Sequence, residues 1–338
     1  MFFQTTSTST ADTSNVTILK PSNKEPIRIG CTGLLTDLPL YVAKAKGFFA
    51  AEGVVVRTSL ELGWKSIESK LSAGNLAVAN VPTLFPLALS LKRSGMVLPM
   101  EAIAITSCHG DAITLNQATM GAFLGGKLNS LKTVRIGVDA PCTGSDLFVQ
   151  KWLKGLRIEK TTVVQLVPIA ISQLIDLLQE GYIQGFCCAE PASQIALQMG
   201  FGSTVARSRD HSPLEIQSVL AATDAFCSAN PGAVKAMAQA LEQARSFCAD
   251  PRNEVEIMHI YREQKVIDQV FSGASLEGKN LTAPLSSLIS FEPATAAIGA
   301  SSRDRLNSLI GVCAALPDAS FTEREIRDEI KRVFHSVI

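Results

Sequence analysis

Short apolar runs rich in β-branched residues alternate, along the first two-thirds of this chain, with stretches whose apolar residues recur at helical spacing. Turn residues bound each run, as they do in buried strands. Such alternation is typical of a mainly parallel sheet with helices on both faces. The sequence therefore predicts an α/β fold, with strands at residues 27–32, 54–61, 77–82, 101–107, 134–140, 163–169, 184–190 and 203–207.

Beyond residue 225 the pattern becomes almost continuously helical. A Pro at position 231 follows a Ser-Ala-Asn sequence, which is typical of the first turn of a helix. This helical C-terminal region is expected to contain helices at residues 232–250, 253–271, 285–299, 301–315 and 321–336.

The 338 residues are enough for about two domains. Because no low-complexity linker divides the chain, we expect two lobes that are joined by strands or short loops and that close on a ligand by hinge motion. The expected division is a disordered tail at 1–26, lobe I at 27–113 plus 217–338, and lobe II at 114–216. A ligand cleft is expected where strand C-termini and helix N-termini meet.

Charge and hydropathy exclude several classes of protein. Lys plus Arg and Asp plus Glu both number 31, with no run of like charges, which argues against a nucleic-acid partner. No segment approaches the roughly 18 uninterrupted apolar residues of a membrane span. Residues 1–25 lack the apolar run of about 7–15 residues of a secretory signal. We therefore expect a cytoplasmic protein, or a periplasmic one if the chain is a trimmed precursor.

The eight cysteines are interpreted as buried free thiols, because most lie within apolar strand or helix patterns. Neither a C-x-x-C spacing nor a nearby His pair indicates a metal site. No cofactor and no metal ion is expected from these residues.

Five blocks resemble a known family in order and in spacing. They are LTDLPLYVAKAKGFFAAEGVVV (35–56), LGWKSIESKLSAGNLAVANVPTLFPLALSLKRSG (62–95), GDAITLNQATM (110–120), DLFVQKWLKGLRI (146–158) and GYIQGFCCAEPASQIALQMGFGSTVARS (181–208). The family is that of the nitrate- and bicarbonate-binding components of ABC transporters and of cytoplasmic nitrate/nitrite sensors. The resemblance implies a type II periplasmic-binding-protein fold with a ligand cleft between two α/β lobes.

The resemblance also places the family's ligand contacts on this chain, and only Trp64 is retained. Asp111 replaces an amide residue, Ser145 a histidine, Ala189 a glycine, and a position near Ser218 a basic residue. A nitrate pocket needs a cation and several hydrogen-bond donors. The changed pocket is therefore expected to disfavour nitrate and to favour a neutral or cationic ligand, or to hold a metal ion with Asp111 and Glu190 beside an anion.

Other polar residues carry both a structural and a ligand-binding interpretation. Thr36, Asp37, Thr143 and Ser145 precede helices, where hydroxyls and backbone N–H groups either cap the helix or bind an anion. His109 stands with Asp111 at an expected crossing between the lobes, in a solvated loop or at the ligand. Glu190 begins a helix, whose dipole stabilises a carboxylate with or without a ligand.

Three functions follow from the resemblance. The first is a sensor that binds a small molecule or oxyanion in its cleft and signals to an antiterminator-type regulatory protein. The alternative is the substrate-binding component of an ABC importer for nitrate, bicarbonate, sulfonate or a thiamine-precursor-like solute, with an ABC permease as partner. An enzyme resembling pyrimidine-precursor synthases is disfavoured, because no nucleophile–base pair or phosphate loop is present.

Overall fold

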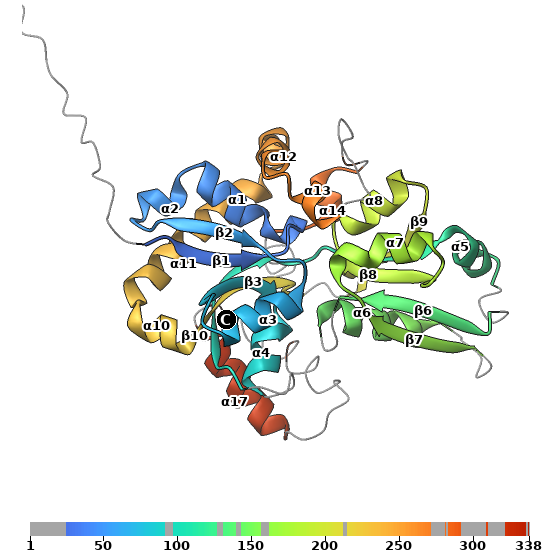
Figure 1. The fold of residues 1–338 in the computed structure, drawn as a ribbon, viewed down its shortest axis with the longest axis horizontal. Coiled ribbons are helices and arrows are strands. Elements are labelled where there is room, and N and C mark those ends of the chain that lie inside the picture. Colours follow the sequence, from blue (N-terminus) through green and yellow to red (C-terminus); the bar gives the residue numbers. More distant parts are fainter. Residues whose placement is uncertain are drawn as a thin grey trace, which may run out of the picture.

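The computed structural model describes residues 25–91, 97–126, 131–139, 143–156, 162–211, 215–271, 281, 283–291, 309, 322–335 and 337. Two lobes lie side by side, each built on a five-stranded sheet (Figure 1). The tail expected at 1–26 lies outside the described residues except for its last two. The helix expected at 301–315 also lies outside them, except for Leu309.

Lobe I is built on a sheet with the strand order β2-β1-β3-β10-β4. Strands β1, β2 and β3 are parallel, whereas β10 is antiparallel to both of its neighbours. The bounds are β1 Ile27–Cys31, β2 Val56–Leu60, β3 Val78–Pro82, β4 Met100–Ser107 and β10 Ser218–Thr223.

Lobe II repeats this arrangement with the order β7-β6-β8-β5-β9. Here β6, β7 and β8 are parallel, and β5 is antiparallel to β8 and β9. The bounds are β5 Asp111–Asn116, β6 Thr133–Val138, β7 Val163–Pro168, β8 Gly185–Ala189 and β9 Gly202–Arg207.

Strands β5 and β10 were absent from the strands expected from the sequence, and both are the first strands after a crossing between the lobes. A strand that follows a crossing starts at the junction between the lobes and runs away from it. The parallel strands of the same sheet run toward the junction, so each sheet contains one antiparallel strand. The eight strands that were expected all coincide with observed ones. The lobe division itself stays a prediction, although its boundary at residue 113 falls inside β5.

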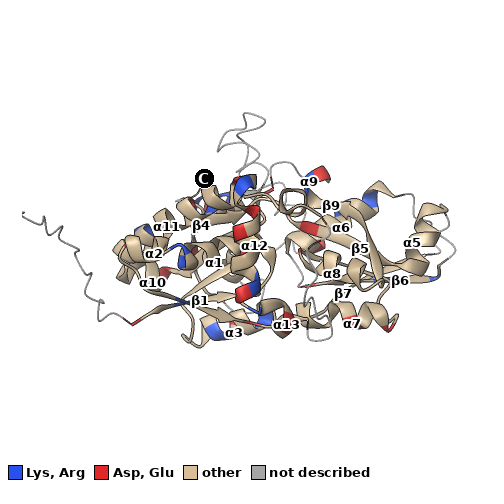
Figure 2. Ribbon diagram, turned by 90° about the horizontal axis from the view of Figure 1, so that it is seen from above, with Lys and Arg blue, Asp and Glu red and all other residues tan. Residues whose placement is uncertain are grey.

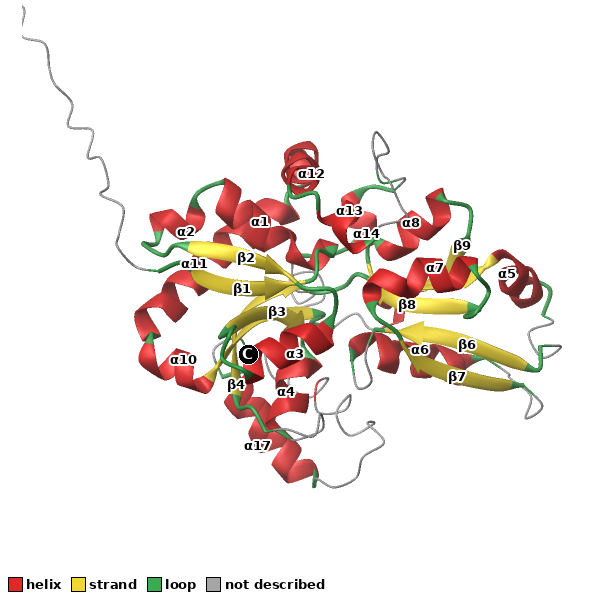
Figure 3. Ribbon diagram, viewed as in Figure 1, coloured by secondary structure: helices red, strands yellow, loops and turns green. Residues whose placement is uncertain are grey.

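Helices cover both faces of each sheet, as Figure 3 shows with strands in yellow and helices in red. One face of lobe I packs against α1, α2, α11, α12 and α14, and the other against α3, α4 and α17. Gly47, with a φ of 74°, separates α1 from α2. The bounds are α1 Leu38–Ala45, α2 Phe48–Ala51, α3 Trp64–Ser72, α4 Leu84–Ser90, α10 Asp224–Ala229, α11 Pro231–Ala249, α12 Glu254–Glu263, α13 Val266–Val270, α14 Leu285–Leu288 and α17 Glu323–Val333.

In lobe II, α5 and α6 pack on one face of the sheet and α7 and α8 on the other. Cys187 and Cys188, adjacent on β8, belong to the cores on these two opposite faces. The bounds are α5 Gln117–Leu124, α6 Gly144–Gly155, α7 Leu174–Gln179, α8 Ala192–Gln198 and α9 Ser208–His211. Short 3-10 turns add η1 Leu35–Asp37, η3 Ile171–Gln173 and η4 Pro251–Asn253.

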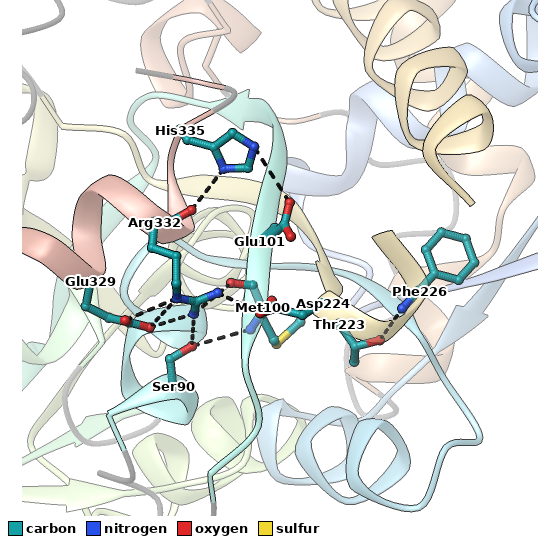
Figure 4. Close-up of polar contacts among 9 residues, drawn as sticks. All are labelled: Ser90, Met100, Glu101, Thr223, Asp224, Phe226, Glu329, Arg332 and His335. Atoms are coloured by element: carbon teal, nitrogen blue, oxygen red, sulfur yellow. Dashed lines mark hydrogen bonds and ion pairs between the residues drawn. The ribbon is translucent and has the colours of Figure 1, made fainter. Parts of the chain in front are cut away.

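The C-terminal helix α17 is part of the core of lobe I. Its apolar side chains, Ile326, Ile330 and Val333, are buried against the α4 face of the sheet. Arg332 anchors the helix by donating to Asp224 and Glu329 and to groups on α4 and β4 (Figure 4). The helix expected at 285–299, by contrast, ends at Leu288, because Ile289 adopts an extended conformation.

Basic and acidic residues are interspersed over both lobes (Figure 2), which agrees with the balanced charge of the sequence. None of the described helices combines the length and apolar character needed to cross a membrane. The six cysteines within the described residues are buried and free, as expected for structural thiols.

Candidate ligand-binding site

A small cavity lies where the two lobes meet. It encloses about 20 Å³, which is room for about one water-sized group. The residues around it follow the C-terminal ends of parallel strands or begin the antiparallel strands β5 and β10, because the parallel strands of both sheets point toward the junction (Figure 3). Its lining residues are Leu34, Thr36, Trp64, Asn80, Val81, Pro82, Asp111, Asp139, Gly144, Ser145, Ala189, Gln217 and Ser218.

The structure brings five of the nine predicted site residues to this cavity, namely Thr36, Trp64, Asp111, Ser145 and Ala189. Asp37, His109, Thr143 and Glu190 are buried nearby but do not line it. Ligand contact by any of the nine stays a prediction.

Trp64 reaches across the junction from the first turn of α3 in lobe I. Its indole Nε1 donates to Oδ2 of Asp139 in lobe II, over 2.5 Å. The ring also packs against Phe85, with 6.3 Å between ring centroids. The retained tryptophan is therefore both a wall of the cavity and a link between the lobes.

Asp139 also accepts two bonds from the start of α6. Ser145 Oγ donates to Oδ1 over 2.7 Å, and Thr143 Oγ1 donates to the same oxygen over 3.1 Å. Thr143 is in addition the N-cap of α6, because its hydroxyl oxygen accepts from the backbone N–H of Asp146. The hydroxyls that the sequence assigned to capping or to anion binding are thus directed at an internal carboxylate.

Asp111 begins β5 and is 5% exposed. Its Oδ1 accepts from Nε2 of Gln217 over 2.8 Å. Burial, together with the nearby carboxylates of Glu215, Asp139 and Glu190, raises the pKa of Asp111 well above its usual range. This group therefore holds its proton more strongly than an ordinary aspartate.

Glu190 is a structural carboxylate. Its Oε1 accepts from Nη1 of Arg207 over 2.7 Å and from the Ser193 hydroxyl, and its Oε2 accepts from the backbone N–H of Gln194. Its backbone carbonyl accepts the N–H of Leu35 over 2.8 Å, which is a second hydrogen bond between the lobes. Since these donors occupy both carboxylate oxygens, the expected pairing of Glu190 with Asp111 around a metal ion is not formed, and no group of three His, Cys, Asp or Glu side chains within the described residues is arranged for a metal.

Asp37 braces the loop between β1 and α1. Its Oδ2 accepts from the backbone N–H groups of Thr32 and Gly33 over 3.0 and 2.8 Å, and its Oδ1 accepts from Asn80 over 2.7 Å. Burial raises the pKa of Asp37 to about 6. Its oxygens are engaged within lobe I, whereas the neighbouring Thr36 lines the cavity.

His109 lies on the crossing between β4 and β5, where it forms an isolated bridge with Ser290. It is 6% exposed, so the solvated loop considered from the sequence is not what forms there.

Four polar residues of the site were absent from the sequence prediction: Asn80, Asp139, Glu215 and Gln217. Asp139 was not predicted because the strand was expected to run to residue 140. In the structure β6 ends at Val138, and Asp139 is the first residue after its C-terminal end. Glu215 and Gln217 precede the unexpected strand β10. The rule that ligands bind beyond strand C-termini could have found Asp139.

The electrostatic balance of the site is negative. In the described part of the chain, no Lys, Arg or His is among the residues that line the cavity, whereas Asp111 and Asp139 are. Burial raises the pKa of the adjacent Glu215 to about 7. The arrangement can therefore bind neutral or positively charged groups more readily than an anion.

Comparison with known proteins gives three kinds of match. The model of the NMT1-like family matches residues 20–261. The bicarbonate transport ATP-binding protein CmpC of Synechococcus elongatus is 29% identical over 263 residues, covering 72% of this chain and 38% of that protein. The nitrate/nitrite binding protein NrtA of the same species is 25% identical over 258 residues, covering 71% of this chain and 58% of that protein.

Solved structures show the same fold. The periplasmic nitrate-binding protein NrtA of Synechocystis PCC 6803 superposes with a TM-score of 0.72 at 17% identity, covering 92% of this chain and 89% of that one. The alkanesulfonate-binding protein SsuA of Xanthomonas axonopodis, bound to MOPS, gives a TM-score of 0.59 at 12% identity, covering 88% and 96%. The expected periplasmic-binding-protein fold is thereby confirmed. The chain spans about two-fifths to three-fifths of the length of the two sequence relatives named above.

Proposed function

Because the chain belongs to the NMT1-like family and is a solute-binding protein in fold and ancestry, we propose that it captures one small polar solute between its lobes and delivers it to the permease of an ABC importer. The relatives are named as binding or transport proteins, which supports the importer function over the sensor function. They also agree with the expectation that the chain is not an enzyme.

The observation that carries the proposal is the cavity between the lobes, toward which several polar side chains converge. Hydrogen bonds cross the junction from Leu35 to Glu190 and from Trp64 to Asp139. Domains that close around a solute by hinge motion make and break such contacts. A concave site lined largely by apolar side chains, with a few convergent polar groups, is the usual form of a ligand site.

The sensor role, with an antiterminator-type partner, and a cytoplasmic location stay predictions from the sequence. The importer and sensor roles differ in their partners. Neighbouring genes for a permease and an ATPase support the importer, and copurification with a regulatory protein instead of a permease supports the sensor.

Binding itself is tested by thermal shift with a panel of nitrate, nitrite, bicarbonate, methanesulfonate, aminopyrimidines, amines and guanidinium. A ligand at a hundred times its Kd stabilises the folded state by about 2.7 kcal/mol. We expect at least one solute to raise the melting temperature, to bind with 1:1 stoichiometry in calorimetry, and to require the chain for uptake in cells. A protein that no solute stabilises, and whose deletion leaves uptake unchanged, contradicts the proposal.

A further inference from the structure

Asp139 occupies the hydrogen-bond donors of the site with a built-in carboxylate. Its two oxygens accept from Trp64 of lobe I and from Thr143 and Ser145 of lobe II, over 2.5, 3.1 and 2.7 Å. The last two residues stand at the start of α6, a helix of 12 residues whose N-terminus favours negative charge. Asp139 therefore has the surroundings that a bound oxyanion would need.

An oxyanion entering the cavity would meet this carboxylate instead of free donors. Burying an anion without donors or a cation is strongly unfavourable, and a second negative charge nearby raises the cost further. Asp139 thus acts against anions both by taking the donors and by repelling the ligand.

Asp111 provides an acceptor that faces the cavity. Its side chain is 5% exposed, and Gln217 donates to Oδ1 only. Its Oδ2 points toward Gly144, where an added methyl group would lie 3.5 Å from that oxygen. In the described part of the chain no donor reaches Oδ2, so this oxygen of a largely buried side chain is directed at the cavity without a partner.

Glu215 adds a further carboxylate near Gly144. The same added methyl group would lie 3.5 Å from its Oε1, and its Oε2 is a buried oxygen without a hydrogen-bond partner among the described residues. Lys151 lies near enough to favour the ionised form of Glu215 and also donates to the backbone carbonyl of His211, whereas Arg207 is paired with Glu190. Burial raises the pKa of both Asp111 and Glu215, and the nearby carboxylates raise that of Asp111 further.

Resting on the proposed solute-binding function, we propose that the cleft binds a small organic cation of the ammonium or amidinium class, with Asp111 as its counter-ion and Asp139 as the residue that excludes oxyanions. Such cations carry N–H donors that match the unpartnered oxygen of Asp111. A metal ion fits less well, because within the described residues no three carboxylate, His or Cys side chains are grouped as ligands.

The inference is tested by isothermal titration of the full chain at pH 7.5 with methylammonium chloride, guanidinium chloride at millimolar concentration, sodium nitrate and calcium chloride. We expect at least one of the two organic cations to bind with 1:1 stoichiometry, and nitrate and calcium to bind at least tenfold more weakly. Nitrate or calcium binding more tightly than both organic cations overturns the inference and leaves the solute-binding function intact. Binding of a neutral solute from the wider panel, without binding of either organic cation, also overturns the inference and leaves the solute-binding function intact.

Two variants and one control assign the roles, with each fold checked by circular dichroism. Asp111→Asn is expected to weaken organic-cation binding at least tenfold, and Asp139→Ala to increase nitrate affinity at least tenfold by freeing Trp64 and Ser145. The control, Asp176→Asn, changes an exposed carboxylate of lobe II and should alter neither affinity. Unchanged cation affinity in Asp111→Asn, or unchanged nitrate affinity in a folded Asp139→Ala, contradicts the assigned role. If no solute of any charge binds the wild type, the proposed function fails as well.

Discussion

The indole N–H of Trp64 donates across the cleft to the carboxylate of Asp139, with 2.5 Å between Nε1 and Oδ2. One residue comes from the helix after β2 and the other from the loop after β6, so the bond exists only while the lobes are together. A contact of this kind is part of the closed arrangement, and its loss shifts the balance toward an open one.

Replacing Trp64 with Phe keeps an aromatic ring beside Phe85 but removes the donor. Hydrogen bonds to charged groups contribute about 1.5–3 kcal/mol, so the closed population should fall by a factor of about ten or more. Small-angle X-ray scattering without added solute should then give a larger radius of gyration. Trp152→Phe, in the core of lobe II, is the control that should leave the radius unchanged. Equal radii for wild type and Trp64→Phe would show that the bond does not hold the lobes together.

The pair formed by Arg207 and Glu190 should be essential for stability. Arg207→Met leaves the buried Glu190 carboxylate uncompensated, and we expect the free energy of unfolding in urea to fall by about 3 kcal/mol. Adding Glu190→Gln to this variant should restore part of the loss, because the uncompensated charge is removed. Arg252→Met, in an exposed ion pair, serves as the control without measurable effect. A double variant less stable than Arg207→Met would contradict this account.

Glu215 should make the folded chain less stable in alkaline than in acidic solution. Its folded pKa of about 7 exceeds the ordinary value of 4.5, so its contribution is fully present below about pH 4.5 and is lost as the pH rises through about 7. Melting temperatures measured from pH 5 to pH 8 should therefore fall less steeply in Glu215→Gln than in the wild type. Glu180→Gln, at an exposed position, should keep the wild-type slope.

Binding of an organic cation should release protons from Asp111. Because the raised pKa of this group favours its protonated form, while a cation favours the ionised form, affinity should increase with pH up to that pKa. Calorimetry in buffers with different ionisation enthalpies measures the number of protons released, which should drop in Asp111→Asn. The charged and titratable groups that interact electrostatically with Asp111 are Glu215, Asp139, Glu190, Cys187 and Cys188. Binding without proton release at any pH would contradict the role of Asp111.

Arg332 should hold the C-terminal helix on lobe I. Arg332→Met removes hydrogen bonds to Asp224, Glu329 and Ser90, and because the side chain is 36% exposed we expect a loss of only about 1 kcal/mol in urea unfolding. Arg324→Met, on the solvent face of the same helix, is the matched control. A loss no greater than that of the control would mean that the apolar contacts alone dock the helix.

Periodicity was sufficient to predict the parallel strands, because a strand buried on both faces leaves a continuous apolar run. The two-lobe architecture was predicted from the chain length, the absence of a linker and the family resemblance. Periodicity was insufficient for β5 and β10. Their direction depends on which lobe the chain has just left, which is a tertiary property and has no local pattern.

The site was predictable only in part, for a related reason. Trp64 was predicted from the family resemblance, and Ser145 from that resemblance and from its position at the start of a helix. Which of the nearby carboxylates faces the cavity depends on partners far along the chain, as Glu190 shows through its pairing with Arg207. Asp139 looked like part of a strand, and its role appears only once Trp64 of the other lobe is beside it.

The position of β10 between β3 and β4 has a consequence for the order in which the chain can fold. The sheet of lobe II is complete once β9 has been made, at Arg207, whereas the sheet of lobe I lacks its inner strand until residues 218–223 follow. Domains generally fold as units during synthesis. The sheet of lobe II can therefore form during synthesis before that of lobe I is complete. Strands β1 to β4 are synthesised earlier, but β3 and β4 pair with β10 only after residues 218–223 have been made.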